Sequence, residues 1–202
     1  MPLARIGQTL LYFAHIPKTG GTSIEAYLRE KGEVAMHHTR PGDWSACSPQ
    51  HIHAAVHTTL FRPGFCDHAF AVLRDPLARL QSEYRYRAAQ VKKRKGLDIQ
   101  PFDDWITKTF RRYGKNPYVF DNHIRPQVEF LSEGMELFAL EDGLDRVFDW
   151  IDHVTGDSRA VPRRWEKKLA PIPITMSEET RARIEEFYAA DYTFLAGQGG
   201  RA

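Results

Sequence analysis

The segment YFAHIPKTGGTSIEAYL, residues 12–28, constrains the fold more than any other part of the chain. It joins the apolar run TLLYFA, typical of a buried strand, to a glycine-containing loop and then to an amphipathic run typical of a helix. The same order returns where HAFAVL leads into RDPLARLQSEYRYRAAQVKKRKG, in which a proline just after an aspartate marks a helix start. Strands that alternate with helices predict an α/β fold with a mainly parallel central sheet flanked by helices.

The chain has 202 residues, of which 42% are hydrophobic, and this is enough for one well-buried core. We therefore expect a single domain over residues 1–202, with residues 196–202 as a frayed tail. The first helix should end at Gly32 in a left-handed conformation. Three further segments are expected to be single helices: PQHIHAAVHTTLF, QPFDDWITKTFRRYG and SEETRARIEEFYAADYTFL.

Charge and composition exclude several classes of protein. The balance of 28 basic against 26 acidic residues argues against a protein held to nucleic acid by bulk charge. No apolar run approaches the ~18 residues of a membrane span, and the first residues lack the pattern of a secretion signal, so we expect a cytoplasmic protein. Cys47 and Cys66 are too few for a disulfide framework and are interpreted as ordinary thiols.

The loop after the first strand has the composition of an anion site. Its backbone N–H groups and the positive end of the following helix would surround one point, which suits phosphate or sulfate oxygens. The residues expected to contribute are Pro17, Lys18, Thr19, Gly20, Gly21, Thr22 and Ser23. The lysine precedes both glycines, whereas it follows them in the loop that binds nucleoside triphosphates. A magnesium-dependent phosphotransferase is therefore disfavoured.

Two motifs together resemble one family. HIPKTGGTSI is similar to the 5′-phosphosulfate-binding loop of sulfotransferases that use 3′-phosphoadenosine 5′-phosphosulfate (PAPS). FAVLRDPLARLQSEYRY resembles the family's 3′-phosphate motif, which implies that Arg74 and Ser82 hold that phosphate. An arginine fork suits a phosphate, and Ser82 lies off the apolar stripe of its helix. Further segments resemble bacterial members of the carbohydrate-type group, so the likeness covers most of the chain and implies a P-loop-like architecture.

The resemblance implies transfer of a sulfuryl group from PAPS to an acceptor hydroxyl or, less readily, an amine. Lys18 would neutralise the leaving oxygen as charge develops. A sulfuryl group carries less negative charge than a terminal phosphoryl group, so no metal is expected and activity should persist in EDTA.

Histidines supply candidates for the base that an acceptor hydroxyl needs. His51 and His53 resemble the His-x-His of uronyl 2-O-sulfotransferases, and an imidazole with a pKa of about 6.5 can accept a proton at neutral pH. The two side chains are roughly 200° apart on an ideal helix, so only one is expected to face the sulfur. His15 is expected to support the loop, and His123 is a candidate for lining the acceptor cleft. His57 follows His53 at the spacing of a metal pair, but no acidic or cysteine ligand pattern accompanies it.

The acceptor is the least constrained part of the prediction. The His-x-His resemblance favours a saccharide hydroxyl. The basic run YRYRAAQVKKRKG is interpreted as a solvated helix end that complements the helix dipole, with a surface for an anionic glycan as the alternative. Arg163, Arg164 and Lys167 fall where related enzymes close a loop over the cofactor, but a solvated basic loop explains them equally, and they receive no role. Trp165 is a candidate either to stack on the adenine or to pack in the protein. The alternative functions are a non-catalytic module that binds the bisphosphate product or an anionic glycan, and an interaction scaffold without nucleotide affinity.

Overall fold

The computed structural model describes residues 2–43, 45–164 and 172–198. Packing divides the chain into two compact units. The sheet unit comprises Met1–Arg74 with Glu129–Lys167, and the helical unit comprises Asp75–Val128 with Lys168–Ala202. Each unit is described here by itself. The single domain over residues 1–202 stays a prediction.

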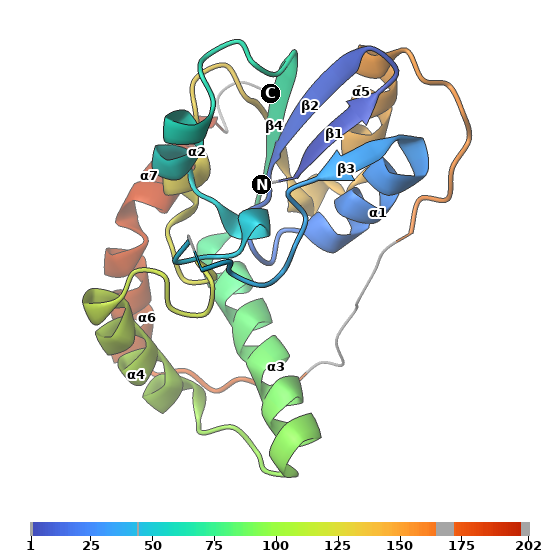
Figure 1. Ribbon diagram of the computed structural model, residues 1–202. Helices are drawn as coiled ribbons and strands as arrows, with labels where there is room; N and C mark the ends of the chain where they lie inside the picture. Colours follow the sequence, from blue (N-terminus) through green and yellow to red (C-terminus); the bar gives the residue numbers. More distant parts are fainter. Residues whose placement is uncertain (1, 44, 165–171, 199–202) are drawn as a thin grey trace. The chain divides into compact units, whose positions relative to one another are not determined.

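The sheet unit is built on five strands in the order β3-β1-β2-β4-β5 (Figure 1). The strands are β1 (Leu3–Ile6), β2 (Thr9–Ala14), β3 (Glu33–Ala35), β4 (His68–Leu73) and β5 (Glu136–Ala139). β2, β4 and β5 pair in parallel, whereas β1 pairs antiparallel with both β2 and β3. Four of the strands therefore run in one direction, and the predicted α/β fold with a mainly parallel sheet flanked by helices is confirmed.

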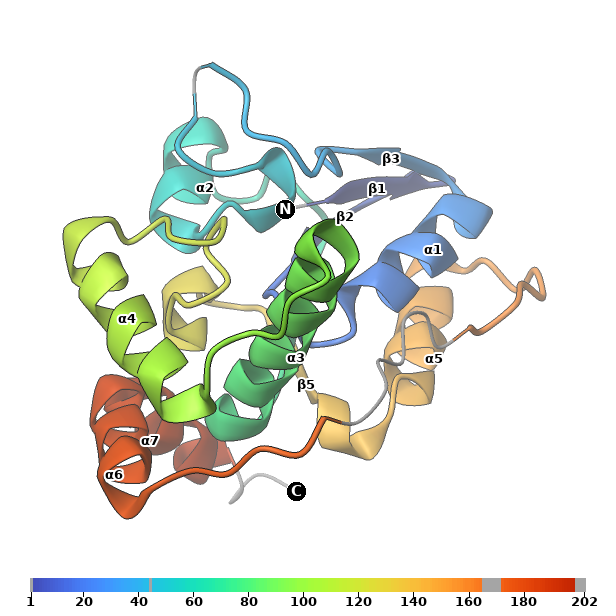
Figure 2. The ribbon, with the colours of Figure 1, turned by 90° about the horizontal axis from the view of Figure 1, so that it is seen from below.

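Helices cover both faces of this sheet. The helices of the unit are α1 (Gly21–Lys31), α2 (Ala54–Leu60) and α5 (Asp145–Thr155), with the short 3₁₀ turns η1 (Pro49–His51) and η3 (Leu140–Asp142). α1 and α5 lie side by side on one face (Figures 1 and 2). Ile24, Leu28 and Phe148 of these helices form one buried cluster with Phe13 and Phe70. On the other face the ring of His57 in α2 stacks on that of Tyr12, with centroids 4.0 Å apart. Successive residues of β2 therefore pack against helices on opposite faces of the sheet.

The sequence did not indicate β1 or β3. β1 has four residues and turns into β2 at Gly7, whose φ of 58° is in the left-handed region. β3 has three residues, and both of its ends are exposed. Neither strand is long enough to give a readable alternation of apolar and polar residues, so both form through pairing with their neighbours.

The prediction of one helix over residues 49–61 is wrong. Its residues form η1, then an extended Ile52 (φ −63°, ψ 131°), and then α2 with His53 as its N-cap residue. The extended backbone at Ile52 buries that side chain completely. His51 and His53 consequently belong to different elements, and the helical angle expected between them does not apply.

The helical unit consists mainly of four helices packed around aromatic side chains. They are α3 (Pro76–Lys95), α4 (Phe102–Lys115), α6 (Glu178–Phe187) and α7 (Ala189–Gln198), and the 3₁₀ turn η2 spans Gln127–Phe130. As predicted, α3 begins at Pro76, and the Asp75 carboxylate accepts a hydrogen bond from the Ala78 N–H. The core of the helical unit includes Leu80, Tyr84 and Trp105.

The last predicted helix is in fact two helices. The chain departs from helical geometry at Tyr188, whose hydroxyl donates to the Ile124 carbonyl at 2.8 Å. The Asp191 carboxylate then accepts from the backbone N–H groups of Gln127 and Val128. The break thus lets α7 satisfy the first two backbone N–H groups of η2. α7 continues to Gln198, so it includes the first residues of the predicted frayed tail.

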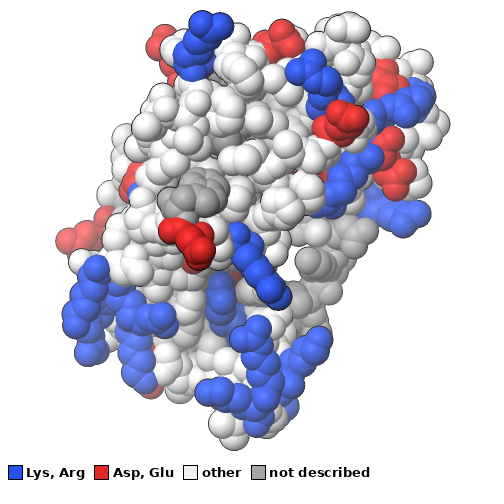
Figure 3. Space-filling model, in the orientation of Figure 1, with Lys and Arg blue, Asp and Glu red and all other residues white. Residues whose placement is uncertain are grey.

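Surface charge gathers on the helical unit. Figure 3 shows lysine and arginine side chains over the end of α3 and over α4. The last turn of α3 carries four basic residues, Lys92, Lys93, Arg94 and Lys95, and the helix ends at Gly96 in the left-handed conformation. Among the residues that the structure describes, no helix is long and apolar enough to cross a membrane.

The glycine that ends α1 is required for a reason other than the predicted one. Gly32 has an extended backbone (φ −172°), so the left-handed conformation expected there is wrong. A Cβ atom at Gly32 would lie 2.1 Å from the Arg5 carbonyl oxygen in β1. Glycine therefore allows the end of α1 to approach the sheet.

We predict that Gly32→Ala destabilises the protein by about 2 kcal/mol, because the backbone of β1 must move to admit the methyl group. Urea unfolding followed by circular dichroism measures this change. Gly114→Ala is the matched control: it lies in α4, and nothing stands within 4 Å of its added Cβ. That variant should be neutral or up to about 1 kcal/mol more stable. Equal stability of Gly32→Ala and the wild type would contradict the prediction.

Candidate functional site

The predicted anion loop connects β2 to the start of α1. Gly20 is the N-cap residue with φ 87°, and Lys18 also has a positive φ, 72°. Two left-handed residues turn the chain sharply, so that the first N–H groups of α1 and its positive dipole end lie next to the loop. This is the local geometry in which a helix start binds phosphate or sulfate oxygens.

His15 holds this loop against α1. A Cβ atom at Gly21 would lie only 2.0 Å from His15 Nε2, so the imidazole ring occupies the space beside the helix start. His15 Nδ1 is 2.6 Å from Glu25 Oε1, and both side chains are buried. The expectation that His15 supports the loop agrees with this packing.

Glu25 is the polar centre of the site, and sequence reasoning missed it. Besides His15, its carboxylate accepts hydrogen bonds from Gln50 Nε2 at 2.6 Å and from Arg29 Nη2 at 2.8 Å. Burial by itself raises the pKa of Glu25, but the His15 and Gln50 hydrogen bonds and the Arg29 charge lower it to about 2. An acid beside Ile24 on the buried side of α1 was the available signal, since acids are rarely buried unless paired.

Arg74 brings the second motif to the loop. It follows β4, which pairs in parallel with β2 in a register that places Ala14 opposite Ala71. Both chains leave the sheet at the same edge, and Arg74 Nη1 donates to the Lys18 carbonyl oxygen at 3.3 Å. Lys18 and Arg74, 56 residues apart in sequence, are therefore neighbours.

The hydroxyl groups of the loop differ in their availability. Thr19 is fully buried, and its Oγ1 donates to the Ile16 carbonyl at 2.8 Å. Ser23 is buried as well, whereas Thr22 is half-buried. Thr19 therefore stabilises the turn with its side chain, and an anion would meet its backbone instead.

The structure distinguishes the two candidate bases. The ring of His51 meets that of His15 edge to face, with centroids 5.0 Å apart, and Ser48 Oγ lies 3.5 Å from His51 Nδ1. His53 precedes α2, and its carbonyl oxygen accepts from the N–H of His57. Both histidines are buried. His51 thus has a ring contact to the loop-supporting histidine.

Two of the predicted residues belong to the helical unit. Ser82 is half-buried on α3, and its pairing with Arg74 stays a prediction. His123 Nδ1 is 2.6 Å from Glu83 Oε2, and Arg87 Nε donates to the same carboxylate at 2.5 Å. His123 is therefore held by a buried acid, as His15 is in the sheet unit.

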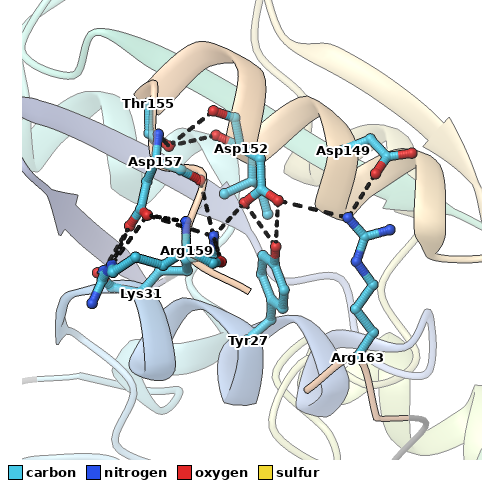
Figure 4. A network of polar contacts seen from close by, with 9 residues as sticks. Tyr27, Lys31, Asp149, Asp152, Thr155, Asp157, Arg159 and Arg163 are labelled. Carbon is cyan, nitrogen blue, oxygen red and sulfur yellow. Dashed lines mark hydrogen bonds and ion pairs between the residues drawn. The ribbon is translucent and has the colours of Figure 1, made fainter. Parts of the chain in front are cut away.

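Arg163 belongs to a network between α1 and α5 (Figure 4). Its guanidinium donates to Asp149 at 2.6 Å, while Tyr27 donates to Asp152 at 2.7 Å. Lys31, whose side chain is fully buried, lies 2.8 Å from the same Asp152 carboxylate. The network fixes the chain after α5 to the end of α1. Arg164 is exposed, and Trp165 and Lys167 lie outside the described residues.

Other ligand chemistries find little support in the described part of the chain. Among residues 2–43, 45–164 and 172–198 no group of three or more His, Cys, Asp or Glu side chains could hold a metal ion. Cys47 and Cys66 are free thiols. The expected independence of metal stays a prediction.

Comparison with known proteins identifies the class. A family model described as the sulfotransferase family matches residues 5–196, nearly the whole chain. The chain therefore belongs to the sulfotransferase family, as its two motifs predicted, and it is a transferase of the sulfuryl-transferring class. Searches of curated proteins and of solved structures returned no significant match.

We predict that the stability of the protein falls in acid because of Glu25. Its folded pKa, about 2, is below the usual 4.5, so the ionised carboxylate stabilises the fold above pH 4.5 and this contribution is lost as the pH falls towards 2. The whole effect is on the order of 3 kcal/mol. Urea unfolding at several pH values measures it.

Glu25→Gln should be less stable than the wild type at pH 7 and should lack this part of the acid dependence. Glu30→Gln is the matched control, since Glu30 is exposed on the same helix. An unchanged acid dependence in Glu25→Gln would show that other groups account for the loss.

Proposed function

We propose that the protein transfers the sulfuryl group of PAPS to an acceptor hydroxyl, and that the hydroxyl belongs to a saccharide. The observation that carries the proposal is the contact between Arg74 and the Lys18 carbonyl. It joins a lysine-containing loop at a helix start to an arginine at the neighbouring strand end. Such a pair offers separate positive groups to the two ends of a nucleotide that bears both a 5′-phosphosulfate and a 3′-phosphate.

In this proposal the loop stabilises charge during an in-line displacement. The acceptor oxygen forms a bond to sulfur while the bond from sulfur to the 5′-phosphate oxygen breaks. Negative charge then develops on the leaving phosphate and on the sulfuryl oxygens. The backbone N–H groups at the start of α1 and the ammonium group of Lys18 face this charge, and 3′-phosphoadenosine 5′-phosphate leaves as product.

His51 is proposed as the base that accepts the proton of the hydroxyl. Its contact with His15 connects it to the donor loop, whereas His53 has a capping position before α2. Gln50, the residue before it, is fixed by its hydrogen bond to Glu25. The same buried carboxylate thus positions the loop and the element that carries the base.

The alternative is a module that binds the bisphosphate or an anionic glycan without turnover. The buried histidines beside the loop favour the enzyme, since binding alone does not need a base. Incubation with radiosulfur-labelled PAPS and a panel of neutral and uronic-acid saccharides, phenols and amines separates the two. Labelled saccharide supports the proposal. Labelled phenol or amine alone would exclude the saccharide, and no labelled product beside tight bisphosphate binding would favour the module.

We predict that Arg74→Ala reduces selectivity for the 3′-phosphate. Calorimetric titration in EDTA should show that the wild type binds 3′-phosphoadenosine 5′-phosphate at least about tenfold more tightly than adenosine 5′-phosphate, because a charged hydrogen bond contributes about 1.5–3 kcal/mol. The ratio should approach one in the variant. Arg40→Ala, an exposed arginine of the same unit, is the control. A preference for ATP with magnesium in the wild type would overturn the donor assignment.

We predict that His51→Ala lowers kcat by about 10²–10⁴-fold with little change in bisphosphate affinity, because a base acts on the proton and not on the donor. His53→Ala should have a smaller effect on kcat and should reduce thermal stability, because it removes a buried side chain and leaves a cavity. Single-turnover assays, calorimetry and thermal unfolding on both variants test this assignment. A larger loss of turnover in His53→Ala than in His51→Ala would reverse it.

A further inference from the structure

A cavity of about 810 Å³ lies in the sheet unit, away from the donor loop. The strand residues that line it are Tyr12 of β2, His68 and Ala69 at the start of β4, and Glu136 at the start of β5. The cavity is therefore at the amino ends of the parallel strands, whereas the loop and Arg74 follow their carboxyl ends. The six residue steps from His68 to Arg74 span roughly 20 Å of extended chain.

One side of the cavity is a row of aromatic rings. The imidazole of His57 stacks on Tyr12 at 4.0 Å and on Phe61 at 5.5 Å, and Phe61 in turn meets Phe65 at 5.1 Å. All four rings line the cavity, and Phe65, at the end of the row, is 48% exposed. The row thus presents an aromatic surface that a further flat ring can extend.

The loop that carries Phe65 is fixed to the sheet. The Asp67 N–H donates to the Leu10 carbonyl at 2.9 Å, and the Asp67 carboxylate accepts from the Leu10 N–H at 2.7 Å. On the opposite side, Trp150 of α5 meets His68 edge to face at 6.0 Å. Regular elements and a doubly bonded loop therefore form the walls, as is usual for ligand cavities.

Buried polar atoms of three lining residues have no hydrogen-bond partner within the described part of the chain. They are Tyr12 Oη, Ser132 Oγ and both ring nitrogens of His57. A buried polar atom without a partner costs about 1–3 kcal/mol. Burial lowers the pKa of His57, so its neutral ring offers one donor and one acceptor. Together these atoms suit a group that both donates and accepts, such as a hydroxyl.

The charges around the cavity exclude an anion as the preferred ligand. Arg62 is the one lysine or arginine among the residues lining it, which also include His57, His68 and His153, and the acids there are Asp67, Glu133 and Glu136. A phosphorylated or sulfated molecule would meet net negative charge here. This cavity therefore has the opposite electrostatic character to the donor loop.

We propose that this cavity is a second ligand site, which binds a small, neutral, planar aromatic molecule carrying a hydroxyl group. The flat ring continues the aromatic row at Phe65, and the hydroxyl bonds with Ser132 and His57. Both side chains turn towards the ligand on binding, since protein atoms cover their polar atoms here. The proposal does not depend on the identity of the donor.

The test is calorimetric titration of the full chain with 2-naphthol, with decahydro-2-naphthol as a probe that has the hydroxyl but no aromatic ring. We expect saturable binding of 2-naphthol with one site, and affinity at least about tenfold lower for the saturated alcohol. Phe65→Ala should weaken 2-naphthol binding about fivefold. Ser132→Ala should weaken it by a similar factor.

Leu60→Ala is the matched control for Phe65→Ala. Leu60 is 47% exposed in the same unit but does not line the cavity, so its removal should leave the affinity for 2-naphthol unchanged. Thermal unfolding verifies that each variant is folded. Titrations with 3′-phosphoadenosine 5′-phosphate present, and with His51→Ala, should give the wild-type affinity.

Four results would overturn the proposal. These are the absence of saturable 2-naphthol binding, equal binding of the saturated alcohol, and equal weakening by Leu60→Ala and Phe65→Ala. The fourth is displacement of 2-naphthol by the bisphosphate or loss of its binding in His51→Ala, either of which would place it at the donor or acceptor site. None of these outcomes bears on the selectivity for the 3′-phosphate, so the two proposals fail separately.

Discussion

The buried carboxylate of Glu25 is the interaction on which the candidate site depends. It lies on α1, and its hydrogen bonds reach His15 in the loop before this helix and Gln50 in η1. Burying a charged group costs free energy unless hydrogen bonds replace its hydration. Here His15, Arg29 and Gln50 supply these hydrogen bonds. Because those partners come from different segments, satisfying one carboxylate fixes their relative positions. The loop, the helix start and the segment with His51 consequently form one rigid constellation, which is what a positioned donor and base require.

The parallel pairing of β2 with β4 supplies the second constraint. Parallel strands end at the same edge of a sheet, so the residues that follow them become neighbours whatever their separation in sequence. Lys18 and Arg74 meet for this reason. Arg74 contacts the backbone carbonyl of Lys18, so the contact stabilises the turn but does not require a lysine side chain at position 18. In the proposed reaction the charge of Lys18 accounts for the lysine, because a turn alone does not need it.

Sequence reasoning succeeded where a local pattern decides the structure. β2 and β4 are continuous apolar runs, and α3 and α4 have apolar residues at helical spacing. Pro76 after Asp75 fixes a helix start through local hydrogen bonding. It failed where tertiary partners decide. The short β1 and β3 exist because their neighbours pair with them, and the break at Ile52 buries a side chain that a continuous helix would have placed elsewhere.

In the site, the loop residues and the neighbourhood of Arg74 could be predicted from the family's motifs. Glu25 could not, since its role comes from contacts with segments that no pattern in α1 reveals.

The sheet separates two kinds of binding chemistry by its direction. At the carboxyl edge, helix α1 starts with its positive dipole end, and Lys18 and Arg74 add charge, so this edge attracts anions. At the amino edge, the cavity is lined by loops and by the C-terminal halves of α2 and α5, so its side chains largely determine its character. Those side chains are aromatic rings and acids. The two proposed ligands, an anionic nucleotide and a neutral aromatic molecule, would therefore meet the sheet at opposite ends of its parallel strands and would not compete.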